Sequence, residues 1–161
     1  MSRSNLEEKA FRHALSKFAT GVTIVTTRDG QGNPIGITAN SFNSVSLDPA
    51  LVLWSVDEDA LSSSVFETVD YFAVNVLSST QLDMSNRFAS RSEYKFMDIP
   101  VSDSPQGSPL FDGCLAQFEC KTWNVYEGGD HKIIVGEVLD FRQNDALEPL
   151  IFFGGDYAKL K

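Results

Sequence analysis

Runs of β-branched and aromatic residues, separated by tight turns and few helical patterns, constrain the fold of this chain most strongly. Such runs predict strands, here at residues 22–27, 35–47, 51–56, 72–77, 115–126, 132–141 and 149–153. The connections are short and hairpin-like, and strands do not alternate regularly with helices. This pattern favours an antiparallel barrel over a parallel sheet, so we expect a mainly β fold with a few helices and six or seven strands.

The helical patterns lie around these strands. Apolar residues recur at helical spacing from residue 6 onward, behind a capping box formed by Ser4 and Glu7, and this helix is expected to end near Gly21. Two further helices are expected, one at 65–69 and one from Ser79, as its cap, to about 89. The segment 51–56 is wholly apolar, except for Ser55, and predicts a strand buried on both faces.

Composition excludes several classes of protein. The 161 residues suit one domain, expected to span 1–161, and the net charge of −9 disfavours binding to DNA, RNA or anionic membranes. The chain lacks an apolar run near the roughly 20 residues of a bilayer span, and its first residues do not resemble a signal peptide. Cys114 and Cys120 fit no zinc pattern, so we expect no metal, reduced thiols and a cytoplasmic location.

Residues 127–131 form the first candidate binding segment. Gly128 and Gly129 allow positive φ and close approach of a ligand, and His131 follows them directly. The alternative is a plain hairpin turn, with His131 as the first residue of the next strand.

Two other segments are candidates for binding a phosphate. Ser62, Ser63 and Ser64 precede a short helix, where hydroxyls and free N–H groups suit an anion, although on these residues alone a simple helix cap is favoured. Three basic residues recur every four positions, and a solvated basic face is the alternative to a phosphate contact. They are Arg87, Arg91 and Lys95.

Small and polar residues interrupt the strand pattern at 38–41. Thr38, Ala39, Asn40 and Ser41 could expose backbone N–H and C=O groups to the polar edge of a flat ring, such as that of a flavin. An edge strand or a β-bulge is the alternative.

Together these segments resemble the short-chain flavin reductase family, the reductase components of two-component flavin-dependent monooxygenases, which have an FMN-binding split barrel. The resemblance runs from about Phe11 to Tyr157, and its matching pieces occur in family order. These pieces are residues 18–27, 36–49, 62–64, 94–96 and 129–131. Each piece is weak alone, and the ordered set is specific.

The resemblance implies a role for each segment. It places the edge of the flavin ring at Thr38, Ala39, Asn40 and Ser41. It places the ribityl chain beside Ser55, Val56 and Asp57, and the flavin phosphate at Ser62, Ser63, Ser64 and Lys95. It assigns the nicotinamide to Gly129, Asp130 and His131, with His131 as the catalytic residue, and adds Tyr157 to the cofactor-binding residues.

The same resemblance implies an NAD(P)H:flavin oxidoreductase that is homodimeric and supplies reduced FMN or FAD to a partner monooxygenase. Asp156 stands where the family often has a basic residue, which leaves the choice between NADH and NADPH open. Two alternatives stay open as well. One is a tight FMN-binding flavoprotein that transfers electrons or reduces a ferric chelate or a nitroaromatic. The other is a binding module for flavin or another planar ligand, without reductase activity.

Overall fold

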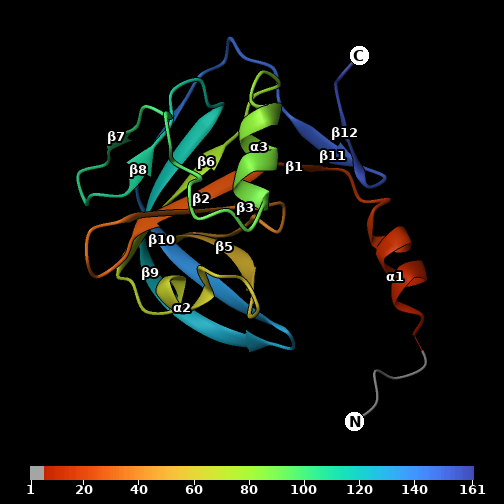
Figure 1. Ribbon diagram of the computed structural model, residues 1–161, viewed down its shortest axis with the longest axis horizontal. Coiled ribbons are helices and arrows are strands. Elements are labelled where there is room, and N and C mark those ends of the chain that lie inside the picture. The colour runs from red at the N-terminus through yellow and green to blue at the C-terminus, as the bar shows by residue number, and fades with distance from the viewer. Residues whose placement is uncertain (1–5) are drawn as a thin grey trace.

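The computed structural model describes residues 6–161 as a curved antiparallel sheet with three short helices around it (Figure 1). The helices are α1 (Glu8–Leu15), α2 (Ser63–Phe66) and α3 (Leu82–Ala89). The long and medium strands are β2 (Thr23–Arg28), β3 (Pro34–Ala39), β4 (Asn43–Leu47), β5 (Ala50–Asp57), β6 (Tyr71–Val76), β9 (Ala116–Gly128) and β10 (His131–Gln143). The short strands are β1 (Thr20–Gly21), β7 (Ser102–Asp103), β8 (Pro109–Leu110), β11 (Ile151–Phe153) and β12 (Asp156–Ala158).

The main sheet has seven strands in the order β3-β2-β6-β9-β10-β5-β4, and all neighbours pair antiparallel. The sheet curls until β3, at one edge, contacts β5 near the other. At this seam the backbone N–H of Ser55 donates to Ser41 Oγ at 2.9 Å, and Ser41 Oγ donates to the carbonyl of Ser55 at 3.2 Å. The prediction of a mainly β, antiparallel split barrel is confirmed.

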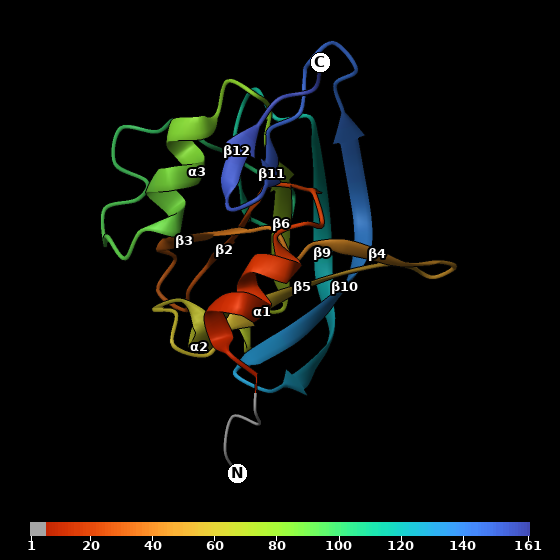
Figure 2. The same cartoon turned by 90° about the vertical axis from the view of Figure 1, so that its right-hand side faces the viewer.

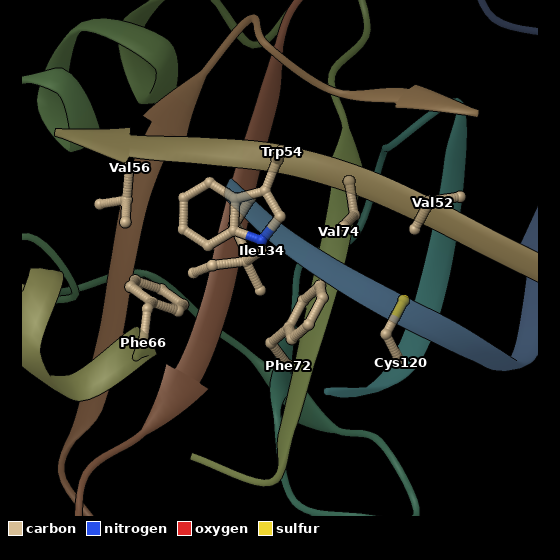
Figure 3. Packing of buried hydrophobic residues seen from close by; sticks show 9 residues of the cluster. Val52, Trp54, Val56, Phe66, Phe72, Val74, Cys120 and Ile134 are labelled. Atoms are coloured by element: carbon tan, nitrogen blue, oxygen red, sulfur yellow. The ribbon is translucent and has the colours of Figure 1, made fainter. Parts of the chain in front are cut away.

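Large apolar side chains fill the interior of the barrel (Figure 3). Trp54 from β5 packs edge-to-face on Phe66 of α2, with ring centroids 4.8 Å apart, and both side chains are fully buried. Phe72 of β6 and Ile134 of β10 complete the packing around the indole. Burying side chains of this size contributes about 1.5–3 kcal/mol each, so this cluster fixes the curvature of the sheet and the position of α2.

The prediction that 51–56 is buried on both faces is wrong. Val52, Trp54 and Val56 point into the core, whereas Leu51, Leu53 and Ser55 lie half-buried on the outer face. Strand side chains alternate between faces, and only the inner face is covered by the rest of the chain. The outer face therefore carries exposed apolar area.

The helices and several strand limits differ from the predictions. α1 is capped by Glu7, whose carboxylate accepts from the backbone N–H groups of Lys9 and Ala10, and it ends at Ser16, short of Gly21. Ser4 lies outside the described residues. α2 spans Ser63–Phe66 instead of 65–69, and α3 starts after Gln81 rather than Ser79. The segment 35–47 breaks into β3 and β4, and the short strands β1, β7, β8 and β12 were not predicted.

α1 extends away from the barrel (Figures 1 and 2). All eight of its residues are exposed, including Phe11 and Leu15, and its apolar side continues to Phe18, which is 78% exposed. None of the helices described between residues 6 and 161 has the length and apolar character needed to span a bilayer.

Candidate functional site

The seam between β3 and β5 is the place where the predicted site residues converge. At one end the seam is closed by the hydrogen bonds between Ser41 and Ser55. Away from this end β3 and the chain after β5 separate, and between them lies a cleft of about 380 Å³. The volume falls in the range of small-molecule and cofactor sites, about 300–1,000 Å³.

The open end of the seam has one apolar and one polar side. Ile35, Ile37 and Phe96 supply apolar surface, while the polar groups come from α2 and from the loop after α3. These polar residues are Ser62, Ser90, Arg91, Ser92, Glu93 and Lys95. A flat apolar ligand that ends in an anionic group suits this division.

Lys95 and Arg91 bring two positive charges to the cleft. The Lys95 ammonium donates to the carbonyls of Phe88 at 2.8 Å and Gly36 at 3.3 Å, which fastens the loop to both α3 and β3. Burial, and then the charge of Arg91, lower the pKa of Lys95. Arg91 is exposed, and among residues 6–161 its guanidinium bonds to the carbonyl of Asp59 alone, at 3.4 Å, so it can turn towards an anion more easily than Lys95 can.

The three serines of the predicted phosphate site have different surroundings. Ser62 lines the cleft. Ser63 is buried, and its hydroxyl donates to Glu67 Oε2 at 3.1 Å, while Ser64 is exposed. The backbone at the start of α2 is partly engaged, because the N–H of Ser63 donates to the carbonyl of Ala60 and the N–H of Val65 donates to the carbonyl of Ser62, each at 3.1 Å.

Residues 38–41 run from the cleft towards the closed end of the seam. The Thr38 hydroxyl donates to the carbonyl of Ser85 on α3 at 2.7 Å, and Ala39 packs against the barrel core. Their side chains therefore point to opposite faces. Alternate backbone groups of an edge strand point away from its partner, and Gly36 O, which accepts from Lys95, is one of them. The same alternation directs the N–H and C=O of Thr38 into the seam.

His131 lies at the end of the barrel, beside the seam. It is the first residue of β10 and pairs with Asp57 of β5, while Ile133 pairs with Ser55. Its Nδ1 lies 2.7 Å from Asp130 Oδ1. An ionised carboxylate can only accept, so Nδ1 carries the proton and Nε2 of the neutral ring is an acceptor. The ring is 42% exposed and so is accessible to a ligand.

Residues 38–41 and 129–131 are thus brought to the same strand, β5, from its two sides. Ser41 bonds Ser55, and His131 pairs two residues further along. Strands lie about 4.8 Å apart and rise about 3.3 Å per residue, so the backbones at Ser41 and His131, on opposite sides of β5, lie about 12 Å apart, a span that side chains and one ring system can bridge together. The enclosed part of the seam, however, is bordered by residues 34–37 and not by 38–41.

Tyr157 lies apart from the other predicted residues. Its hydroxyl is 2.7 Å from Ser85 Oγ and donates to Asn86 Oδ1 at 3.1 Å, so it packs β12 against α3. Arg91 lines the cleft, although the resemblance assigns it no role. Its only signal in the sequence is the four-residue repeat with Arg87 and Lys95.

These residues fit a flavin. The cleft offers an apolar wall for a ring system, the edge of β3 offers backbone groups for its polar rim, and the open end offers Ser62 and Arg91 for a phosphate. The outer face beside His131 is open to a second ligand.

Comparison with known proteins gives the same family by sequence and by structure. Residues 15–161 match the model of the flavin reductase like domain. The chain is 44% identical over 151 residues to the FMN reductase (NADH) SmoA of Agrobacterium fabrum, an alignment that covers 94% of this chain and 85% of SmoA.

Two further relatives are a longer reductase found by sequence and a solved structure that superposes on this chain. The reductase component of the flavin-dependent trigonelline monooxygenase of Acinetobacter baylyi is 44% identical over 133 residues, 83% of this chain but 43% of that longer protein. The NADH:FAD oxidoreductase SgcE6 of Streptomyces globisporus, solved in complex with NAD and FAD fragments, superposes with a TM-score of 0.91 at 37% identity. This alignment covers 96% of this chain and 93% of SgcE6.

Proposed function

Since the chain belongs to the flavin reductase like domain family, we propose that it is an NADH-dependent flavin reductase whose ligands meet at the seam between β3 and β5. The observation that carries the proposal is the convergence of Ser41, Ser55, Asp57 and His131 on one end of this seam, with a cleft at the other. When bound, the flavin and the nicotinamide supply the hydride chemistry themselves, and the protein supplies position and charge.

The flavin phosphate would lie at the open end, near Ser62 and Arg91, and the ring would extend along the edge of β3 towards 38–41. The carbonyl and N–H of Thr38 would then bind the polar rim of the ring, and Ser55 and Asp57 would flank the ribityl chain, together with the backbone of Val56, whose side chain is buried in the core. In this arrangement Lys95 acts mainly by holding the loop that carries Arg91, because its ammonium is already bonded to two carbonyls.

His131 would orient the nicotinamide. In the neutral imidazole, with Nδ1 donating to Asp130, Nε2 is an acceptor, and a carboxamide N–H is a matching donor. Gly129, at φ +73° and with open space around its Cα, allows close approach of the ligand. We expect no obligatory proton transfer from His131, because hydride transfer needs none.

We propose that the functional unit is a dimer. The outer face of β5, β9 and β10 carries Leu53, Ile133 and Tyr126 next to His131, and α1 exposes a second apolar surface. Contiguous apolar surface of this kind marks an interface, and a second copy would also cover the ligands beside His131. Light scattering after size exclusion tests this: we expect the mass of two chains, and of one chain in Phe18→Asp. A monomeric wild-type protein refutes it.

The products would serve a partner monooxygenase, as the name of the Acinetobacter baylyi relative states for that protein. A tight flavoprotein that reduces another acceptor is the alternative. A cytoplasmic location stays a prediction from the two free cysteines.

Oxidation of NADH and NADPH, followed by absorbance with FMN, FAD or riboflavin supplied in turn, tests the activity. We expect NADH oxidation that depends on added flavin, and a protein that purifies almost colourless. A protein that purifies yellow, with its flavin retained during turnover, supports the alternative flavoprotein. A protein that binds flavin but oxidises neither nicotinamide is a binding module, and the proposal is then wrong.

A further inference from the structure

Lys132 follows His131 in sequence but points to the opposite face of the sheet. In the ladder between β10 and β5, His131 pairs with Asp57 on the outer face and Lys132 pairs with Val56, which is buried. Because strand side chains alternate, Lys132 turns inward at the end of the barrel. Its side chain is only 17% exposed, although it carries a charge.

Three carboxylates from three segments surround the Lys132 ammonium. Glu127 of β9 is hydrogen-bonded to Nζ, Glu58 after β5 lies at 3.4 Å, and Glu67 after α2 lies at 3.8 Å. Glu67 also accepts the hydroxyl of Ser63. One ammonium therefore joins the β9–β10 hairpin, the chain leaving β5 and the end of α2.

The segments joined by Lys132 differ in how firmly they are held otherwise. α2 is anchored by Phe66, which is fully buried against Trp54. The corner at 128–131 contains two exposed glycines, and its contacts with the chain at the end of β5 include the pairing of His131 with Asp57 and the bond from the backbone N–H of Glu58 to the carbonyl of Asp130, at 3.0 Å. Loss of Lys132 would leave three carboxylates facing one another, and the corner would move before α2 does.

We propose that Lys132 is a positioning residue for His131. It fixes the 128–131 corner to α2 and to the end of β5, and so sets the position of the imidazole beside the seam between β3 and β5. The proposal rests on the role given to His131 above. The hydrogen bond that the Lys132 ammonium donates to Glu127 raises the pKa of Lys132, so the ammonium stays charged at neutral pH.

Lys132→Met removes the charge and keeps much of the side-chain volume, and Lys132→Arg restores the charge. Lys121→Met is the matched control, because Lys121 is an exposed lysine on the same hairpin. We expect Lys132→Met to raise the KM for NADH, and the Kd for NAD⁺ measured by calorimetry on FMN-loaded protein, about three- to tenfold and no more than His131→Ala does, with the Kd for FMN within about twofold. Lys132→Arg and Lys121→Met should behave as wild type.

Two measurements separate positioning from general stability. Amide hydrogen exchange should accelerate at 128–131 in Lys132→Met and stay unchanged in α2. In the His131→Ala background, Lys132→Met should add little to the KM for NADH, since its effect passes through His131.

Independent, additive effects in this double variant would overturn the proposal. So would an equal loss of FMN and NAD⁺ affinity, or a Lys132→Met protein with wild-type constants. If Lys132→Met does not fold, Glu127→Gln replaces it: it should raise the KM for NADH to a smaller extent, and unchanged constants overturn the proposal. A wild-type protein that does not oxidise NADH refutes the proposed function instead, while hydrogen exchange still tests whether Lys132 holds the corner.

Discussion

Replacement of Gly36 by alanine tests how closely the cleft depends on the packing beneath it. Gly36 lies on β3 at the cleft, and a Cβ built there would lie 2.8 Å from Phe88 Cε1 and 3.1 Å from Phe96 Cζ. The shorter contact is about 0.7 Å inside the 3.5–4.0 Å optimum for two carbon atoms. Phe88 is fully buried and packs edge-to-face on Phe96 with ring centroids 4.9 Å apart, so Phe88 cannot shift without displacing Phe96.

Overpacking of this kind costs about 1–3 kcal/mol, and for a chain of this size each kcal/mol lowers the Tm by about 2–4 °C. We therefore expect Gly36→Ala to lower the Tm by about 2–12 °C in a calorimetric scan. Phe96 is the ring with freedom to move, because it borders the cleft, so fluorescence titration should also show weaker FMN binding.

Gly30→Ala is the matched control for this experiment, because a Cβ at Gly30 meets nothing within 4 Å. It should leave both the Tm and the FMN affinity close to wild type. Equal behaviour of Gly36→Ala and Gly30→Ala would show that the contacts under the cleft do not limit either property, and the reasoning would fail.

Three further predictions concern charge and hydrogen bonding. Arg91→Met should raise the Kd for FMN about tenfold, through a lost charge-assisted bond, and leave riboflavin binding unchanged in the same titration; equal losses for both ligands would contradict a phosphate contact. His131→Ala should raise the KM for NADH about 2–12-fold, the equivalent of one neutral hydrogen bond, with the Kd for FMN nearly unchanged; the opposite pattern would remove His131 from the nicotinamide site. Burial raises the pKa of Cys114 to about 11 and of Cys120 to about 12, from 9.0. A raised folded-state pKa contributes stability below pH 9.0 that is lost as the pH rises towards 11, so the wild-type Tm should fall more steeply over this range than that of Cys120→Ala. Parallel curves would contradict this.

The strands could be predicted because their residues carry a local signal. Val, Ile and Thr in 22–27 and the alternation in 115–126 indicate strands whatever surrounds them, and both segments form central strands of the sheet. The break at 40–42 has a tertiary cause, since the chain leaves β3 there to bring Ser41 onto Ser55. Likewise, α1 is shorter than its apolar pattern because no described part of the barrel packs against it.

The outer face of β5 shows a limit of reading burial from hydrophobicity. Leu51 and Leu53 are as apolar as the core residues beside them, yet they lie half-buried on an uncovered face. Hydrophobicity indicates that a side chain favours burial, but it does not show whether the covering surface comes from the same chain or from a second one.

The segments that form the candidate site could be predicted from the sequence, but the side-chain contacts within it could not. Resemblance to a family identified 38–41, 62–64 and 129–131, and the structure brings these segments to one seam. Spacing alone could not show that Lys95 is bonded to two carbonyls while Arg91 is freer, or that Lys132 is enclosed by three glutamates. Those facts depend on side chains from distant parts of the chain.

The central claim is that NADH and flavin meet on this protein closely enough for direct hydride transfer. Anaerobic mixing of the protein with FMN and NADH, followed through the visible absorbance of the flavin, tests it most directly. We predict that the flavin band bleaches much faster with the protein than without it, and that deuterium at the transferred position of the nicotinamide slows the bleaching. Bleaching at the same rate with and without the protein would contradict the account.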